Sequence, residues 1–126
     1  MNCKILVVDD EERIGIILTK FLSKEGFEVV VATDGENALR IAKEQLPDLI
    51  VLDVVMPGMD GGDVMAGLAN DDELKRIPVV LLTGLISEDE TAGFNNTDYG
   101  GKVVLSKSLD IMEQVDVIKR VLGFQR

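Results

Sequence analysis

Five short apolar segments recur along the chain, at residues 5–8, 29–32, 49–52, 79–82 and 103–105. They consist of Val, Ile, Leu and Ala, without alternation between apolar and polar positions. This pattern is typical of strands that are buried on both faces, as in a parallel sheet. The pattern therefore predicts five strands in one parallel sheet.

Between these segments and after the last of them, apolar residues recur at the spacing of an amphipathic helix. Three such stripes consist of Ile14, Ile17, Leu18, Phe21 and Leu22; of Ala38, Leu39, Ile41 and Ala42; and of Ile111, Val115, Ile118 and Leu122. Asp34 and Ser108 are the predicted N-caps of the second and third stripes. Gly26, Pro47 and Gly123 stand where the three helices should end.

Two further segments between the strands have weaker helical patterns. A shorter helix is expected around residues 63–69, where Val64, Met65 and Leu68 form a modest apolar face. Residues 85–101 read LISEDETAGFNNTDYGG, and apolar positions are too sparse there for a stripe. We expect about one or two helical turns near residues 87–92 and then an irregular loop. The fourth helix of the chain should thus be short or irregular.

Strands that alternate with helices indicate βαβ units with right-handed crossovers, and hence a three-layer α/β sandwich. The 126 residues suit a single domain spanning positions 1–126. In such sheets, functional residues gather beyond the carboxyl ends of the strands, where the strand order reverses. The residues at the strand ends are therefore the candidates for a functional site.

The net charge of the chain indicates which classes of partner it can bind. The chain has 23 acidic and 13 basic residues, and its net charge is −10. Such a field repels phosphate backbones and anionic membranes, so we expect no direct contact with nucleic acid or membrane. Cations and basic protein surfaces are the expected partners.

The numbers of cysteine and histidine residues indicate the redox compartment and exclude some kinds of metal site and catalytic site. Cys3 is the single cysteine and cannot form an internal disulfide, and no signal-peptide pattern opens the chain. These features predict a reducing, cytoplasmic setting. The absence of histidine excludes most zinc sites and every Ser/His or Cys/His catalytic pair.

Polar residues stand at the carboxyl ends of four predicted strands, and they are Asp9 and Asp10, Asp53, Thr83 and Lys107. Carboxylates packed this closely repel one another unless a cation lies among them. Oxygen ligands of this kind suit Mg²⁺ better than a softer metal. The set also suits phosphoryl chemistry, because a carboxylate can attack phosphorus while a metal, a lysine and a hydroxyl hold the other oxygens.

Four motifs resemble those of the receiver domain of two-component response regulators, the family that includes the small chemotaxis response regulator. The motifs are KILVVDDEE at residues 4–12, LIVLDVVMPGMDG at 49–61, PVVLLTG at 78–84, and Lys107 within VVLSKS. The resemblance covers essentially the whole chain. It implies a flavodoxin-like (βα)5 fold with strand order 2-1-3-4-5.

The resemblance implies a role for each residue of the site. Asp53 would accept a phosphoryl group from a phosphohistidine on a sensor histidine kinase or a histidine phosphotransfer protein. The implied Mg²⁺ ligands are Asp9, Asp10, Asp53 and the main-chain carbonyl of Val55, with Asp9 acting partly through water. The domain would catalyse only its own phosphorylation and dephosphorylation.

The resemblance also implies a switch. Thr83 would turn its hydroxyl toward the phosphoryl group, Lys107 would pair with that group, and the small Gly84 would leave room for it. Phosphorylation would then bias a two-state surface that binds a downstream protein target, and homodimer formation on activation is compatible with the family.

Three positions depart from the family pattern. Ser108 follows Lys107 where the family usually has a proline after a cis peptide, and a cis bond before a non-proline residue costs about 2.5–4 kcal/mol. Val104 stands where the family usually has the Tyr or Phe that turns inward on activation, and a β-branched residue is stiff at χ1. Val55, two residues after Asp53, predicts slower attack by water on the phosphoryl group than a polar residue would give.

Three alternative functions remain open at this point. A phosphatase of the haloacid-dehalogenase type also uses an Asp nucleophile with Mg²⁺, but it needs a second Asp at the position of Val55. A pseudo-receiver that is never phosphorylated is disfavoured by Asp53, Thr83 and Lys107, while Ser108 and Val104 favour it. A flavodoxin-like FMN-binding protein would need a Ser/Thr-rich phosphate loop after the first strand, which the sequence lacks.

Overall fold

The computed structural model describes residues 3–54, 61–83, 103–107 and 109–123. Five strands form one sheet, and they are β1 (Lys4–Val8), β2 (Glu28–Ala32), β3 (Leu49–Asp53), β4 (Val79–Thr83) and β5 (Val103–Ser106). All neighbouring strands are parallel, in the order β2-β1-β3-β4-β5. The predicted flavodoxin-like topology is therefore confirmed.

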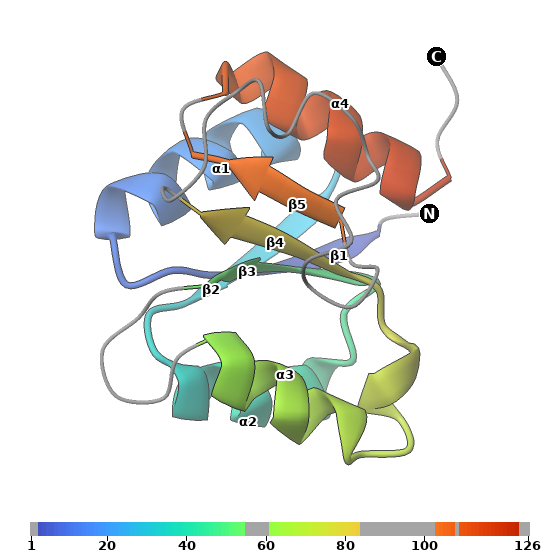
Figure 1. Ribbon diagram of the computed structural model, residues 1–126. Coiled ribbons are helices and arrows are strands. Elements are labelled where there is room, and N and C mark those ends of the chain that lie inside the picture. Colours follow the sequence, from blue (N-terminus) through green and yellow to red (C-terminus); the bar gives the residue numbers. More distant parts are fainter. Residues whose placement is uncertain (1–2, 55–60, 84–102, 108, 124–126) are drawn as a thin grey trace.

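Helices cover both faces of this sheet. The described helices are α1 (Glu12–Lys24), α2 (Gly35–Gln45), α3 (Gly61–Ala69), the short 3-10 helix η1 (Leu74–Arg76) and α4 (Ile111–Val121). Figure 1 shows α1 and α4 on one side of the sheet and α2 and α3 on the other. This arrangement confirms the three-layer sandwich.

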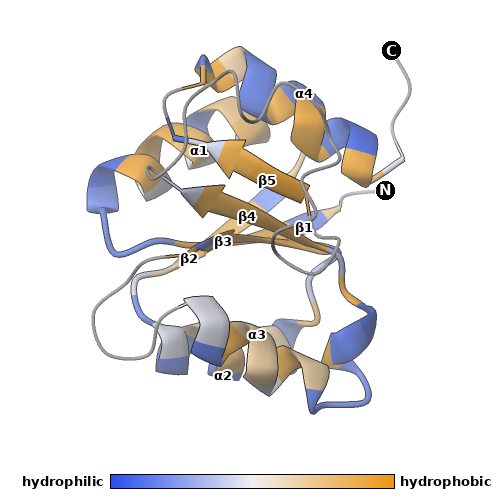
Figure 2. Cartoon of the chain, viewed as in Figure 1, coloured by the Kyte–Doolittle hydropathy of each residue, from blue (hydrophilic) through white to orange (hydrophobic). Residues whose placement is uncertain are grey.

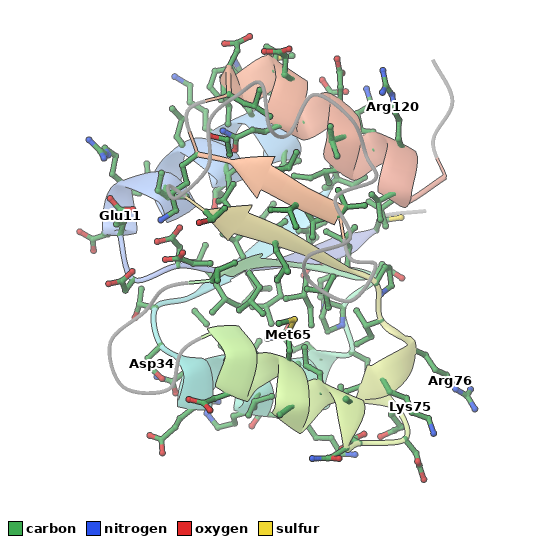
Figure 3. All side chains as sticks on the ribbon, viewed as in Figure 1. Glu11, Asp34, Met65, Lys75, Arg76 and Arg120 are labelled. Carbon is green, nitrogen blue, oxygen red and sulfur yellow. The ribbon has the colours of Figure 1, made fainter. Side chains whose placement is uncertain are left out.

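Figure 2 shows that the strands are mainly apolar, and β1, β3, β4 and β5 are buried along almost their whole length, whereas the edge strand β2 is partly exposed. Along β1, Ile5 and Val7 belong to the core on the α1 and α4 side, whereas Leu6 and Val8 belong to the core on the α2 and α3 side. Met65 on α3 packs against the second of these cores (Figure 3). Burial on two faces explains why the strands lack polar alternation.

Each strand extends beyond the apolar segment that predicted it. Asp53 and Thr83 are the last residues of β3 and β4, and each is paired with a residue of the next strand, Leu82 and Ser106 respectively. Strand pairing depends on main-chain hydrogen bonds, which a polar residue makes as well as an apolar one. Hydrophobicity therefore predicted the strands but not the polar residues that end β3, β4 and β5.

One position of the predicted stripe on α1 is wrong. Ile17 is 38% exposed, and Gly15, which the pattern passed over, is buried. The buried face of α1 is centred on Gly15, Leu18 and Leu22, so Ile17 lies at its margin. A Cβ on Gly15 would lie 2.9 Å from Cγ1 of Val31, so glycine lets the helix approach β2 closely.

The predicted caps differ in outcome. Asp34 is the N-cap of α2, and its Oδ1 accepts a hydrogen bond from the main-chain N–H of Asn37 at 2.8 Å, which lowers the pKa of the Asp34 carboxyl. The prediction of Ser108 as a cap is wrong, because the N-cap of α4 is Asp110. A main-chain hydrogen bond from Leu109 to Ser106, at 3.2 Å, closes a turn after β5 and delays the start of the helix.

Some predictions fall outside the described residues. The short fourth helix near residues 87–92, its following loop and the Lys107–Ser108 peptide are among them. In the described ranges, no helix combines the length and the apolar character that crossing a membrane would require.

Candidate functional site

The candidate site lies at the carboxyl edge of the parallel sheet, toward which the arrowheads of β4 and β5 point in Figure 1. Three main-chain hydrogen bonds continue the sheet past its strands, from Asp9 N to Ala32 O (3.1 Å), from Val54 N to Leu82 O (3.0 Å) and from Lys107 N to Thr83 O (2.8 Å). These bonds fix the backbone at three of the predicted site residues. Rigid strand ends thus hold the polar side chains at this edge.

The structure brings the three predicted aspartates together. Asp9, Asp10 and Asp53 each offer a carboxylate oxygen, and these oxygens all lie within 4.8 Å of one another. Asp9 is fully buried and Asp53 is 2% exposed, whereas Asp10 is exposed. Because β1 and β3 are neighbours in the sheet, residues far apart in sequence form one acidic cluster.

Lys107 supplies the positive charge at this cluster. Its Nζ lies 3.1 Å from Oδ2 of Asp9 and 3.3 Å from Oδ2 of Asp53. The Lys107 side chain is only 16% exposed. Buried carboxylates are tolerated when a cation pairs with them, so Lys107 accounts for the burial of Asp9 and Asp53.

Burial acts to lower the pKa of Lys107, but the surrounding carboxylates more than offset it. Hydrogen bonds to Glu11 and Asp9, and the negative charges of Asp9 and Asp53, leave the pKa of Lys107 above its usual value. The lysine therefore stays protonated throughout the physiological pH range, as an ion-pair partner and not as a base.

Glu11 also belongs to the site, although the sequence patterns did not assign it there. Its Oε1 lies 2.6 Å from Lys107 Nζ, the shortest contact that this ammonium makes with the described residues. The hydrogen bond with Lys107 lowers the pKa of the Glu11 carboxyl. The only signal in the sequence was its position directly after Asp9 and Asp10, and a helix start explained that position equally well.

The acidic cluster fits a divalent cation. Oδ2 of Asp9 is buried and accepts no well-aligned hydrogen bond from the described residues, although Lys107 Nζ lies nearby. Such an atom retains the capacity to bind a cation. The ligand set is made only of carboxylate oxygens, with Asp10 on the solvent side, and this suits Mg²⁺ with several bound waters.

The remaining predicted residues have different positions. Thr83 is fully buried at the end of β4, next to Ser106 of β5 in the register. Val104, the predicted switch position, is 1% exposed and belongs to the core on the α2 and α3 side. Val55 and Gly84 lie outside the described residues.

Gly61, the first residue of α3, packs directly on the backbone that carries Asp53. A Cβ at this position would lie 2.7 Å from the main-chain oxygen of Asp53 and 2.8 Å from Cα of Val54. We expect Gly61→Ala to destabilise the fold by about 1–3 kcal/mol and to weaken Mg²⁺ binding, because a rigid backbone must move. Urea unfolding and Mg²⁺ titration measure the two effects.

Gly67→Ala is the matched control, since the three atoms nearest to a Cβ there belong to the side chain of Leu39, the closest at 2.8 Å. That side chain can rotate, so Mg²⁺ binding should be unchanged. Equal losses of Mg²⁺ binding in both variants would contradict the assignment of Gly61 to the support of the site.

Comparisons with known proteins agree with this geometry. The sequence model of one family, the response regulator receiver domain, matches residues 5–119. The response regulator PleD of Caulobacter vibrioides is 42% identical over 110 residues, which cover 87% of this chain and 24% of PleD. Sporulation initiation phosphotransferase F of Bacillus subtilis is 35% identical over 122 residues, which cover 97% of this chain and 95% of that protein.

A solved structure of the chemotaxis protein CheY4 of Vibrio cholerae is similar over 96% of this chain and 99% of its own, with a TM-score of 0.82 and 28% identity. The chain spans only about a quarter of PleD, but nearly all of the other two proteins. The same fold and the same family description thus recur in independent comparisons. The chain belongs to the receiver domain family of two-component response regulators.

Proposed function

We propose that this domain accepts a phosphoryl group on Asp53 in a Mg²⁺-dependent reaction, from a phosphohistidine of a sensor histidine kinase or a histidine phosphotransfer protein. Receiver domains of response regulators accept phosphoryl groups from such donors in signalling. The observation that carries the assignment of Asp53 is its position beside both the Asp9 and Asp10 pair and the ammonium of Lys107. A carboxylate held beside a metal site and a lysine is suited to nucleophilic attack on phosphorus.

Each residue of the site has a distinct role in the proposed reaction. An oxygen of Asp53 attacks the phosphorus, a new O–P bond forms, and the N–P bond of the phosphohistidine breaks with its electron pair leaving on the histidine nitrogen. Bound Mg²⁺ would neutralise the carboxylates and the phosphoryl oxygens. Lys107 pairs with a phosphoryl oxygen, and Thr83 directs its hydroxyl toward the group as part of the switch with Gly84.

The proposal extends to organisation and partners. Residues 1–126 are proposed to form one receiver domain with a cytoplasmic setting, and the net charge of −10 supports a protein partner rather than nucleic acid. Phosphorylation is proposed to change the surface that binds a downstream target and to permit homodimer formation. Val104 has no ring to turn inward, so this signal is proposed to depend on Thr83 rather than on Val104.

Mg²⁺ should bind the acidic cluster and stabilise the fold. Titration with MgCl₂ is expected to raise the melting temperature, because an ion that binds only the native state stabilises it. Asp10→Asn removes one charged ligand and should weaken Mg²⁺ binding about tenfold. Asp116→Asn makes the same charge change at an exposed position on α4 and should leave the affinity unchanged. Equal affinities in the two variants would contradict the site.

The experiment that tests the function is incubation with Mg²⁺ and acetyl phosphate, followed by intact-mass measurement. One added phosphoryl group is expected, and a chelator should prevent it. Absence of the adduct while Mg²⁺ is bound would favour the pseudo-receiver alternative. Fast turnover of small phosphate esters would instead favour a phosphatase.

A further inference from the structure

The ammonium of Lys107 contacts three carboxylates, and the closest of them is Glu11 and not either aspartate. Its Nζ lies 2.6 Å from Oε1 of Glu11, compared with 3.1 Å to the nearer oxygen of Asp9 and 3.3 Å to Asp53. An ammonium has three N–H donors, and they are used by hydrogen bonds to Oε1 of Glu11, Oδ1 of Asp9 at 3.4 Å and Oδ2 of Asp53. A phosphoryl group that arrives on Asp53 must take a donor from one of them.

The side chain of Glu11 is turned toward the site instead of toward its own helix. Glu11 occupies the N-cap position of α1, where a side chain usually accepts a hydrogen bond from the first helical turn, but it makes no such bond. Its main-chain N–H donates to Oδ1 of Asp9 at 2.8 Å, which fixes the backbone next to the acidic cluster. The carboxylate is thereby directed at Lys107, beside the start of α1 (Figure 3).

Of the three carboxylates, Glu11 is the one that can release the lysine most easily. The Glu11 side chain is 44% exposed, whereas the side chains of Asp9 and Asp53 are 0% and 3% exposed. Water can therefore solvate Glu11 when Lys107 leaves, while a buried carboxylate would lose the cation that offsets its charge. The other oxygen of Glu11 already lies 3.5 Å from the guanidinium of Arg13, which gives the freed carboxylate an alternative cation.

We propose that Glu11 is a positioning residue that holds Lys107 in the resting domain and yields it to the phosphoryl group on Asp53. The inference rests on the proposed function for the second half of this exchange, and on the observed contacts for the first half. Because Glu11 competes with the phosphoryl group for the same ammonium, it opposes phosphorylation. Release of Glu11 also removes the side-chain contact that joins Lys107 to the start of α1, which connects the site to that helix.

The test compares Glu11→Ala with Glu12→Ala. The two residues are adjacent, exposed and equally charged, but Glu12 makes no ion pair with any described residue. With Mg²⁺ and acetyl phosphate, Glu11→Ala should be phosphorylated roughly fivefold faster than the wild type, the factor expected from losing one partly exposed ionic competitor. Glu12→Ala, which makes the same change in net charge, should stay close to the wild-type rate.

A second measurement follows the contact itself by NMR. In the unphosphorylated wild type, the side-chain carboxyl carbon resonance of Glu11 should shift when Lys107 is replaced by Met, and that of Glu12 should not. On phosphorylation of the wild type, the Glu11 resonance should move toward its position in Lys107→Met.

The possible outcomes test the resting contact between Glu11 and Lys107 separately from its release on phosphorylation. A Glu11 resonance that is insensitive to Lys107→Met overturns the resting contact, whether or not Asp53 is phosphorylated. A resonance that stays unchanged on phosphorylation, or equal rates for Glu11→Ala and Glu12→Ala, overturns the release. If the wild type forms no adduct at all, the proposed function fails and the release fails with it, while the resting contact is still judged by the resonance.

Discussion

Asp53→Asn is expected to abolish the phosphoryl adduct while the domain stays folded. Asparagine has nearly the same shape as aspartate, but its amide is not the nucleophile that forms an acyl phosphate. Asp53 is almost fully buried at the end of β3, so an isosteric replacement keeps the packing there. Intact mass after incubation with Mg²⁺ and acetyl phosphate should show an adduct in the wild type and none in the variant.

Asp116→Asn is the matched control for this variant, because it makes the same substitution at an exposed position on the last described helix. It should form the adduct as fast as the wild type does. An adduct that persists in Asp53→Asn would place the acceptor elsewhere, and peptide mapping would then show whether Asp9 or Asp10 carries it.

The sequence was sufficient to predict the sheet because four of its five strands are buried almost completely and the edge strand β2 is apolar as well. A continuous apolar run as short as residues 49–52 is best explained as a buried strand. Helices that connect such strands lead to parallel pairing. The pattern could not predict that Asp53 itself pairs with β4, since main-chain hydrogen bonds leave no trace in hydrophobicity. It also misplaced Ile17, because it ranked apolar residues above Gly15, whose small size lets α1 approach β2.

The site was predictable to the extent that strand topology determines it. A parallel sheet brings the carboxyl ends of its strands to one edge, so the sequence alone was enough to group Asp9, Asp53 and Lys107. Glu11 could not, since its role depends on which way one side chain turns at the start of a helix. Ser108 failed as a cap for a related reason, because the turn that closes between Ser106 and Leu109 decides where α4 begins.

Lys107→Met is expected to have the largest effect on stability. The substitution keeps an apolar side chain of similar length but leaves Asp9 and Asp53 buried without their cation. Removing one partner from a buried ion pair destabilises proteins by about 3–5 kcal/mol, and we expect a loss of about 3 kcal/mol in the free energy of unfolding. Urea unfolding in the presence of a chelator measures it, and the phosphoryl adduct should form more slowly as well.

Mg²⁺ should reverse much of this loss, because a cation in the acidic cluster compensates the same carboxylates that Lys107 pairs with. Added Mg²⁺ is therefore expected to stabilise Lys107→Met more than it stabilises the wild type. Lys119→Met is the control, since Lys119 pairs with Glu25 at 2.7 Å between α4 and the end of α1, away from the aspartates. It should lose less stability than Lys107→Met does, because Glu25 is 31% exposed and water can solvate it, and it should respond to Mg²⁺ as the wild type does. If both lysine variants respond equally to Mg²⁺, the lysine and the metal do not share the acidic cluster.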